Sequence, residues 1–461
     1  MDRETPTDSA PVASAPPARE GKLGRLVLRA SLADMAGYGA SQVLRLASNL
    51  VLSRLLFPEA FGLLALVNIF NQGLVMLSDV GIEPAVIQSP RGDDPDFLNT
   101  AWTIHVVRGF ILYSIALVLA WPMSAFYGQP ELASLICVCS LSVVLTGLTS
   151  TSLITLRRRL ALGTLALVEL GSQAASVAVM ITWAYFHRTV WALAGGALTS
   201  AAVRMLASHA LRVGYRNRFR SEKSARSSIF HFGKWIFASS AVYFLSKQGD
   251  RLFLGRFLGV MDLGVYSIAV FLSESVATVV TRLTHGVLYP AFSRVRDEGR
   301  DRLLAAYYRA RLAMDALTMP LLGLLTMLGP WVVHVLYDRR YAEAGWMLQA
   351  FAVRVAMACV LVPCESCLFT MGRTRYALYE NIARTVWIAI AIPVGWHFFG
   401  LRGLVYAAAL SELPVFLVLW PPFRAEGMLR LRLEARAPLL FGVGVALGAP
   451  LARVLAGVGG R

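Results

Sequence analysis

Long apolar segments follow one another through this chain from about residue 31 to residue 458, and only short loops separate them. A helix needs about 20 consecutive apolar residues to cross the hydrocarbon core of a bilayer. Because that core offers no water to hydrogen-bond the backbone, spanning segments must be helices or the strands of a closed barrel. The segments here are continuously apolar and do not alternate residue by residue, which excludes a barrel. The sequence therefore predicts an all-α, polytopic membrane protein.

The lengths of the apolar segments set the number of crossings. The predicted spans are at about 31–54, 61–80, 99–121, 131–154, 163–186, 189–210, 232–256, 263–289, 311–336, 343–369, 377–399 and 403–423, and a last apolar segment follows at about 437–458. Charged residues make up only 16% of the chain, against about 25% in soluble proteins. The last segment contains Pro450 and several glycines, which predict a weak helix that either crosses once or folds back.

The segment 50–62 occurs a second time, at 252–264, without a gap. In each copy an apolar run ends in an arginine, a short turn follows, and a new apolar run opens at a glycine. The matched residues are Leu50 and Leu252, Leu52 and Leu254, Arg54 and Arg256, Leu56 and Leu258, and Gly62 and Gly264. Chance similarity between two Leu-rich runs is the alternative, but further matches continue the repeat, such as Arg157 with Arg373. Internal repeats indicate an architecture built from copies of one unit.

Each copy predicts a membrane hairpin that opens a bundle of six spans. Because six is even, both bundles begin on the same side of the membrane, and they are parallel repeats related by an axis along the membrane normal. The chain is then expected to contain a disordered tail, a first six-helix bundle, a basic cytoplasmic linker, a second six-helix bundle, and a basic loop with the C-terminal membrane segment. Their predicted bounds are 1–21, 22–210, 211–231, 232–423 and 424–461.

The net charge of +16 is carried mostly by loops that alternate along the chain. Loops on one side are rich in arginine, as in Arg157–Arg159 and the linker at 211–231, whereas loops on the other side are short and poor in charge. By the positive-inside rule, the arginine-rich side and the N-terminus are cytoplasmic. Topology and contact with membrane lipids therefore explain the net charge, and no nucleic acid partner is expected.

The five cysteines all lie within predicted spans. Cys364 and Cys367 have the spacing of a metal or redox pair, but no second Cys or His pair lies near them in the sequence. Small apolar residues at a helix interface are the favoured interpretation, and no metal or other cofactor is expected.

Charged residues in the middle of the spans indicate a candidate site, because each costs roughly 2.5–3.5 kcal/mol at the bilayer centre. The candidate cations are Arg45, Arg108, Lys247, Arg251, Arg354 and Arg384. They outnumber the mid-span acids, and the surplus requires an anion or a wet cavity. Arginine offers a fork of donors that matches phosphate oxygens, so a pyrophosphate-binding site is predicted. Internal pairs, Lys247 with Asp250 and Glu380 with Arg384, are the alternative for part of the set.

The acids in the second half form a second candidate group, for ion coupling. Its members are Asp250, Glu274, Glu365 and Glu412. The three glutamates have no obvious cation on the same helical turn, and an unpaired buried carboxyl group takes up a proton more readily. Acids inside a helix bundle therefore suit coupling to H⁺ or Na⁺. Hydrogen-bonded packing of these glutamates is the alternative.

The repeated hairpin carries a resemblance to a known family. The run Leu52-Ser-Arg-Leu-Leu-Phe-Pro-Glu-Ala-Phe-Gly62 resembles the first hairpin of bacterial polysaccharide transporters, the oligosaccharide flippase family. The segments from Phe232-Gly233, at 250–259 and at 263–269 resemble the opening of that family's second half, and Gly345-Trp346 is also similar. The resemblance covers about 25–425. The same superfamily holds multidrug and toxin extruders and the lipid II flippase.

The resemblance implies a MATE-like, V-shaped protein with two lobes and twelve or more helices in the bacterial inner membrane. It implies transport of an undecaprenyl-diphosphate-linked oligosaccharide repeat unit from the inner to the outer leaflet, for exopolysaccharide or O-antigen (lipopolysaccharide) synthesis. Polymerisation would follow outside, which makes the polysaccharide polymerase machinery a candidate partner. The family offers no ligand motif that can be transferred residue by residue.

The two alternative functions are a different kind of transporter and an enzyme. A multidrug or cation extruder of the same superfamily would favour an acidic cavity, whereas the mid-span charges here are predominantly cationic. A membrane glycan polymerase or ligase would need a long external loop and a catalytic constellation, such as Ser/His/Asp, and neither is evident in the sequence. A transporter without enzymatic activity is therefore expected.

Overall fold

The computed structural model describes residues 20–79, 81–211 and 216–459, and for 20–32, 34, 227–239, 285 and 456–459 it describes the helical backbone alone. Throughout these residues the chain forms helices and short connections, without a strand. The all-α class is therefore confirmed. The predicted disorder of 1–21 falls almost entirely outside the described residues.

The first half of the chain forms nine helices within the described residues. They are α1 (Glu20–Leu55), α2 (Pro58–Met76), α3 (Ile82–Gln88), α4 (Pro95–Tyr127), α5 (Pro130–Cys139), α6 (Leu141–Gly147), α7 (Ser152–Arg158), α8 (Leu162–Phe186) and α9 (Trp191–Ala210). Prolines open α2, α4 and α5, where the missing N–H costs nothing because the first turn has no intrahelical acceptor for it.

The second half follows the same order and adds a terminal pair of helices. Its elements are α10 (Lys223–Phe257), α11 (Val260–Leu283), the π-helix η1 (Thr284–Leu288), α12 (Tyr289–Arg296), α13 (Arg300–Leu336), the 3₁₀-helix η2 (Arg339–Tyr341), α14 (Ala344–Thr370), α15 (Arg375–Ala409), α16 (Leu413–Ala425), α17 (Leu431–Glu434) and α18 (Arg436–Gly459). The helix α10 begins at Lys223, inside the stretch assigned from sequence to the linker.

Nine of the described helical stretches are long and apolar enough to cross a membrane. One of them, 375–425, contains two of the predicted spans. The helices α1, α9 and α10 are not among the nine, because polar and charged side chains interrupt their apolar runs. The chain is a multi-pass membrane protein, as predicted.

Two predicted spans are broken in the structure. The span 131–154 leaves the helix at 148–151, where the hydroxyl of Ser208 accepts a hydrogen bond from the Ser150 N–H at 2.9 Å. A side chain thereby satisfies a backbone group that the helix has released. The span 403–423 is interrupted between α15 and α16, which places Glu412 at a helix break.

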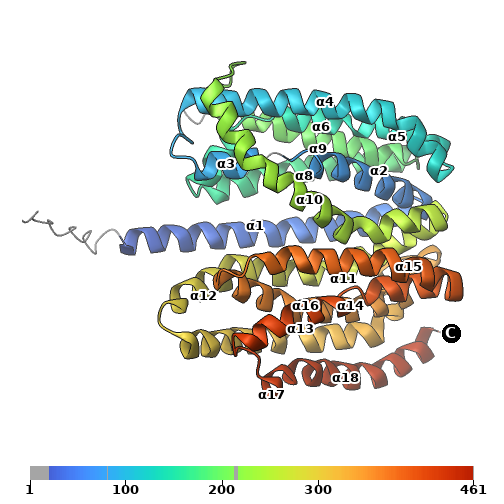
Figure 1. The fold of residues 1–461 in the computed structure, drawn as a ribbon. Coiled ribbons are helices and arrows are strands. Elements are labelled where there is room, and N and C mark those ends of the chain that lie inside the picture. Colours follow the sequence, from blue (N-terminus) through green and yellow to red (C-terminus); the bar gives the residue numbers. More distant parts are fainter. Residues whose placement is uncertain (1–19, 80, 212–215, 460–461) are drawn as a thin grey trace, which may run out of the picture.

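Figure 1 shows two groups of helices with α1 running between them. The helices α2 to α9 form one group and α11 to α18 form the other, while α10 passes diagonally from the first group toward the second. We use "hairpin end" for the end of the protein that carries the turns at 56–57 and 258–259. The opposite end, which carries residues 216–222 and 426–430, is the "linker end".

The two halves meet through the duplicated glycines. A Cβ atom built on Gly62 would lie 1.8 Å from the carbonyl oxygen of Val260, and one built on Gly264 would lie 2.0 Å from the carbonyl oxygen of Pro58. Only glycine allows the backbones of α2 and α11 to approach this closely. The contact is symmetric, because Pro58 and Val260 also correspond in the repeat.

The buried apolar cores show where the halves are joined. One large core cluster lies toward the hairpin end and draws on both halves, with Leu56 and Leu63 from the first and Tyr266 and Phe351 from the second. Toward the linker end the clusters are separate. One contains Phe292 and its neighbours in the second half, and another packs α3 against α4 in the first. Apolar burial therefore joins the halves mainly at the hairpin end.

The linker is hydrogen-bonded to the first half along α4. The N–H of Arg218 donates to Asn99 Oδ1 at 2.8 Å, and the N–H of Glu222 donates to Thr100 Oγ1 at 3.0 Å. The Glu222 carboxylate also pairs with Arg91 at 2.8 Å. These contacts fix the start of α10 on the first half.

The terminal helix α18 is continuous and packs along α13, as Figure 1 also shows. The helix runs without a break through Pro450, so the segment does not fold back between 436 and 459, and glycines at its contact with α13 are used for packing. A Cβ on Gly444 would lie 2.1 Å from the Pro320 carbonyl oxygen, and one on Gly323 would lie 2.2 Å from that of Phe441. Such close approach is how helices associate where apolar lipid surrounds them.

A buried ion cluster also anchors α17 and α18. Arg311 of α13 lies 3.2 Å from Asp315 Oδ2 and 2.5 Å from Glu434 Oε2, and all three side chains are almost fully buried. Arg311 Nη1 further donates to the Tyr307 hydroxyl at 3.0 Å. One arginine thus pairs with acids from two helices.

Candidate functional site

A polar cavity of about 390 Å³ lies between the two halves. It is bounded mainly by α1 and α2 on one side and by α10 and α11 on the other, and we call it the interlobe cavity. Its polar lining consists of Gln42, Arg45, Ser48, Asn49, Asn68, Gln72, Gln248, Arg251, Ser267, Glu274, Ser275 and Thr278. Three of the predicted site residues, Arg45, Arg251 and Glu274, therefore share one cavity.

Arg45 is the cation that the first half contributes. Its side chain is exposed within the cavity, with Cζ 5.0 Å from the ring centroid of Phe271 across the interface. Among the side chains that the structure describes, no carboxylate forms an ion pair with it. Arg45 thus presents an uncompensated positive charge beside an aromatic face, an arrangement that leaves its donors available.

The second half contributes a chain of alternating charges. Glu274 of α11 lies 3.4 Å from Arg251 Nη2 through one oxygen and 2.9 Å from Arg354 Nη2 through the other. Asp250 accepts a hydrogen bond from Tyr266 at 2.6 Å and lies 3.9 Å from Arg354 Nη1. Glu274 therefore links an arginine in the interlobe cavity to one deeper in the second half.

A smaller polar pocket of about 100 Å³ lies behind this chain, within the second half. Arg384 donates from Nε and Nη2 to the two oxygens of Glu412, at 3.2 and 2.8 Å, and both side chains are buried. Lys247 also lines this pocket, with Nζ 5.9 Å from the ring centroid of Tyr243. Glu274 borders both cavities, so it connects them.

Two predicted site residues lie outside this arrangement. Arg108 donates from Nε to the Ser78 hydroxyl at 3.0 Å and from Nη2 to the Val75 carbonyl, so it closes the end of α2. Glu365, on α14, is not among the residues that line the interlobe cavity or the smaller pocket. The structure thus brings together eight of the ten candidates, in two adjoining cavities.

The pairing of the charges differs from the pairs considered in the sequence. Lys247 forms no ion pair with Asp250 in the described part of the chain, and the partner of Arg384 is Glu412 instead of Glu380. Glu274 and Glu412, which have no cation on their own turn, take arginines from other helices. Spacing along one helix cannot show contacts between helices, so these pairs could not be predicted from the sequence. In the two cavities, Arg45 and Lys247 are the cations left without an ion pair among the described residues.

Neutral polar residues of the interlobe cavity were missed in the sequence. The Gln248 side-chain amide donates a hydrogen bond to Gln72 Oε1 at 2.7 Å, and the Tyr337 hydroxyl donates one to Asn49 Oδ1 at 2.7 Å. A signal was available, because Gln42, Arg45 and Asn49 recur at helical spacing in an otherwise apolar run. The residues predicted for the site are all charged, whereas the amide side chains are neutral.

The interlobe cavity continues toward the linker end. An adjoining pocket of about 430 Å³ shares Gln42 and Arg45 with it and is also lined by Arg157 and Arg282. At the hairpin end, the contact of Gly62 with Gly264 and the shared apolar core join the halves. A polar path therefore leads from the linker end to Arg45.

Residues 51–345 match the polysaccharide biosynthesis protein family. The chain belongs to this family. The lipopolysaccharide biosynthesis protein WzxC of Escherichia coli K12 is 24% identical over 369 residues, which cover 79% of this chain and 74% of WzxC. The succinoglycan biosynthesis transport protein ExoT of Rhizobium meliloti is 24% identical over 317 residues, which cover 68% of this chain and 63% of ExoT.

Solved structures show the same fold for this member of the family. The lipid II flippase MurJ, in an inward closed conformation, superposes with a TM-score of 0.69 over 92% of this chain and 98% of MurJ, at 12% identity. A multidrug resistance MATE family transporter, in an inward-facing conformation, superposes with a TM-score of 0.66 over 84% and 95%, at 15% identity. The predicted MATE-like fold is confirmed, and the family and its relatives indicate a transporter of polysaccharide biosynthesis, not an enzyme.

Proposed function

We propose that this protein moves undecaprenyl-diphosphate-linked oligosaccharide repeat units across the bacterial inner membrane, for exopolysaccharide or O-antigen synthesis. The main support is the interlobe cavity, in which the uncompensated Arg45 faces a wall of amides and hydroxyls. The names of WzxC and ExoT, both biosynthesis proteins for polysaccharides, and of the lipid II flippase MurJ agree with this substrate class. The polysaccharide polymerase machinery is the candidate partner that would receive the product.

The diphosphate is assigned to Arg45 and Arg251. Arg251 has a buried Nε without a hydrogen-bond partner among the described residues, and its ion pair with Glu274 is long, at 3.4 Å. A diphosphate in the interlobe cavity would accept bonds from both guanidinium groups, and charge-assisted bonds of this kind are roughly twice as strong as neutral ones. Arg354, Lys247 and Arg384 would raise the positive potential behind this site. Arg108 would instead hold the end of α2 through its hydrogen bonds to Ser78 and Val75.

The sugars are assigned to the neutral lining. Asn68, Gln72 and Gln248 offer both amide donors and carbonyl acceptors, and Ser267 offers a hydroxyl. Such groups match sugar hydroxyls without adding charge. The lipid tail would remain in the bilayer, so the cavity needs to hold the head group alone.

The positive-inside rule assigns the linker end and the N-terminus to the cytoplasm. The head group would then enter through the pocket lined by Arg157 and Arg282 and reach Arg45. Release outside requires the halves to separate at Gly62 and Gly264 while they close at the linker end. Rocking of two parallel repeats about a central site is the usual form of alternating access.

Ion coupling is assigned to Glu274, with Asp250 and Glu412 behind it. If the diphosphate draws Arg251 away, Glu274 loses one of its two cations, and uptake of H⁺ or Na⁺ would compensate. Loss of that ion would return Arg251 to Glu274 and displace the diphosphate. Glu365 lines neither cavity and has no assigned part in this exchange.

The test is export in a host that lacks the native gene. The double variant Arg45→Gln/Arg251→Gln should lower polysaccharide export roughly tenfold or more and accumulate the lipid-linked intermediate, because hydrogen bonds to charged groups contribute about 1.5–3 kcal/mol. The matched control is Arg188→Gln, an exposed arginine of the hairpin end in the α8–α9 connection. Protein levels in the membrane must be equal. Full export by the double variant would refute the assignment.

A further inference from the structure

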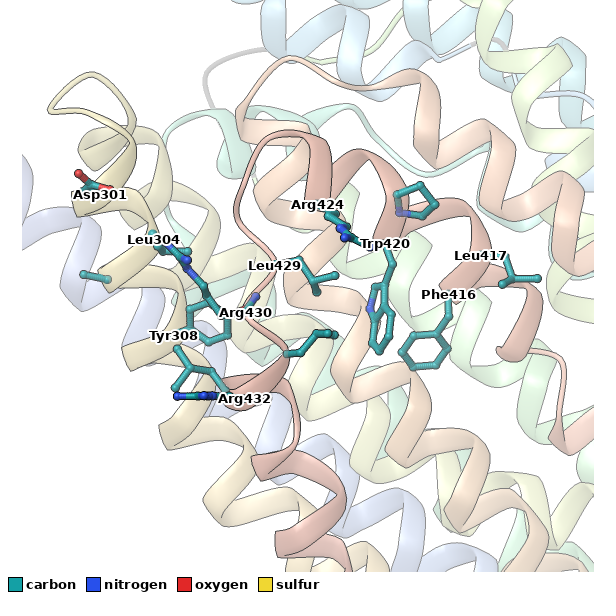
Figure 2. Close-up of a pocket in the computed structure, with 14 residues that line it drawn as sticks. Asp301, Leu304, Tyr308, Phe416, Leu417, Trp420, Arg424, Leu429, Arg430 and Arg432 are labelled. Atoms are coloured by element: carbon teal, nitrogen blue, oxygen red, sulfur yellow. The ribbon is translucent and has the colours of Figure 1, made fainter.

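A groove of about 1150 Å³ lies at the linker end of the second half, apart from the interlobe cavity. The start of α13, the helix α16 and the segment 429–433 form its walls. Figure 2 shows Phe416, Leu417 and Trp420 along one side and Leu304 and Tyr308 on the other. The groove is thus apolar over much of its surface, although it is open to the outside.

Three arginines line the same groove. Arg424, Arg430 and Arg432 are exposed, and none of them forms an ion pair within the described residues. Among the described residues that line the groove, Asp301 is the one acid, so this lining carries a net positive charge. Other exposed arginines of this end, such as Arg91, Arg157 and Arg373, have carboxylate partners.

The apolar and basic parts of the groove are ordered along the helix. Phe416, Trp420 and Arg424 are spaced four residues apart and lie on one face of α16. Because α16 ends at the linker end, its apolar face lies within the membrane and Arg424 lies at the membrane surface. A ligand that fits must have an anionic head at the surface and an apolar chain that extends into the bilayer.

The basic segment is held in place before any ligand binds. The Tyr308 hydroxyl lies 3.1 Å from the Met428 carbonyl oxygen and 3.0 Å from Glu434 Oε1, and it accepts a hydrogen bond from the Arg430 N–H at 2.8 Å. The backbone that carries Arg430 is therefore fixed, which reduces the entropic cost of binding.

We propose that this groove binds one anionic phospholipid, with its phosphate among Arg424, Arg430 and Arg432 and its acyl chains along Phe416 and Trp420. With the orientation proposed above, the lipid belongs to the cytoplasmic leaflet. A soluble anion would make no use of the apolar wall, and a neutral lipid would leave three arginines without a counterion. The site does not depend on what the interlobe cavity carries.

Fluorescence quenching tests the site directly. The purified full-length protein in neutral detergent is titrated with brominated phosphatidylglycerol and, separately, with brominated phosphatidylcholine. Trp420 is one of ten tryptophans, so Trp420→Phe identifies its share of the signal. We expect phosphatidylglycerol to quench a component that Trp420→Phe lacks, at concentrations where phosphatidylcholine does not. Equal quenching by both lipids would refute the charge-based site.

The arginines are tested by a triple variant with a matched control. Arg424→Gln/Arg430→Gln/Arg432→Gln should weaken the quenching by phosphatidylglycerol on the order of a hundredfold, since each basic residue near an anionic lipid surface contributes about 1 kcal/mol. The control, Arg218→Gln/Arg294→Gln/Arg375→Gln, removes the same charge from exposed residues outside the groove. If the triple variant does not fold, the proposal is still tested by comparing quenching by the two lipids in the unsubstituted protein and in Trp420→Phe.

Competition with other anions distinguishes a phospholipid site from a simple anion site and from a site for the transported lipid. Displacement of phosphatidylglycerol by inorganic phosphate at equal concentration would show a simple anion site and overturn the proposal. Stronger binding of undecaprenyl phosphate than of phosphatidylglycerol would show a site for the transported lipid and overturn it as well. Quenching that depends on both the arginines and Trp420, and that resists inorganic phosphate, would support a phospholipid site.

Discussion

Gly62 and Gly264, which are 202 residues apart in the chain, lie in direct backbone contact across the two halves. A Cβ atom on either one would be 3.2 Å from the backbone nitrogen of the other and within about 2 Å of a carbonyl oxygen on the partner helix. The residues correspond in the internal repeat, so the contact lies on the symmetry axis that relates the halves. This contact closes the hairpin end in the conformation described here.

Gly62→Ala should therefore open the hairpin end. The added methyl group meets the backbone of Val260, which cannot turn aside as a side chain could, and overpacking of this kind costs about 1–3 kcal/mol. An impermeant thiol reagent applied from the hairpin end should label Ser267→Cys in the interlobe cavity several-fold faster when Gly62→Ala is also present.

The control for this prediction is Gly171→Ala, where a Cβ meets nothing within 4 Å. The same glycine variants without Ser267→Cys give the background from native cysteines. Unchanged labelling with Gly62→Ala would mean that the glycine contact does not hold the hairpin end closed.

The buried pair of Arg384 and Glu412 should behave as a coupled unit. Removal of one partner leaves an uncompensated buried charge, which typically costs about 3–5 kcal/mol. We expect Arg384→Met and Glu412→Leu each to lower the melting temperature markedly and the double variant to recover much of the loss. Thermal unfolding in detergent measures this cycle, and additive effects would contradict the prediction.

Arg311 should be needed to keep the terminal helices in place. Arg311→Leu leaves Asp315 and Glu434 buried without their cation, so the loop at 426–430 should become much more sensitive to protease. The comparison is Arg309→Leu, an exposed arginine close by on the same helix. Equal sensitivity of the two variants would argue against the ion cluster as the anchor of α17 and α18.

The attachment of the linker to the first half should be lost at low pH. The pKa of Glu222 is lowered to about 2, chiefly by the hydrogen bond from Arg91, and the same arginine lowers the pKa of Asp94. A depressed carboxyl pKa means that the stabilisation is complete above the ordinary pKa of about 4.5 and is lost as the pH falls through about 2.

A spin label on Arg216→Cys measures this attachment. It should stay immobilised from pH 8 to pH 5 and gain mobility as the pH approaches 2. With Arg91→Ala the label should already be mobile at pH 7. Immobilisation that is independent of both pH and Arg91 would show that the hydrogen bonds to Asn99 and Thr100 suffice.

The sequence predicted the fold well because membrane helices have a strong signal, and the repeat at 50–62 and 252–264 placed the halves in register. The cavity was only partly predictable. Charges at Arg45, Arg251 and Glu274 could be recognised individually because each is costly in a bilayer. The ion pairs could not be predicted, because they join different helices. The contact of Arg384 with Glu412, for example, depends on a helix break at 410–412. The amides of Asn49 and Gln72 carry no charge, so the cost of burying charge does not point to them.

The helix α10 is fastened to the first half at its start, where Glu222 is bonded to Thr100 and Arg91. Farther along, the same helix packs against α2 of the first half and against α15 of the second. One continuous helix, α10, therefore packs against both halves and acts as a rigid rod between them. Any reversal of the opening from one membrane face to the other must bend, tilt or slide this rod, so the rigidity of a single helix would set how far the lobes can swing.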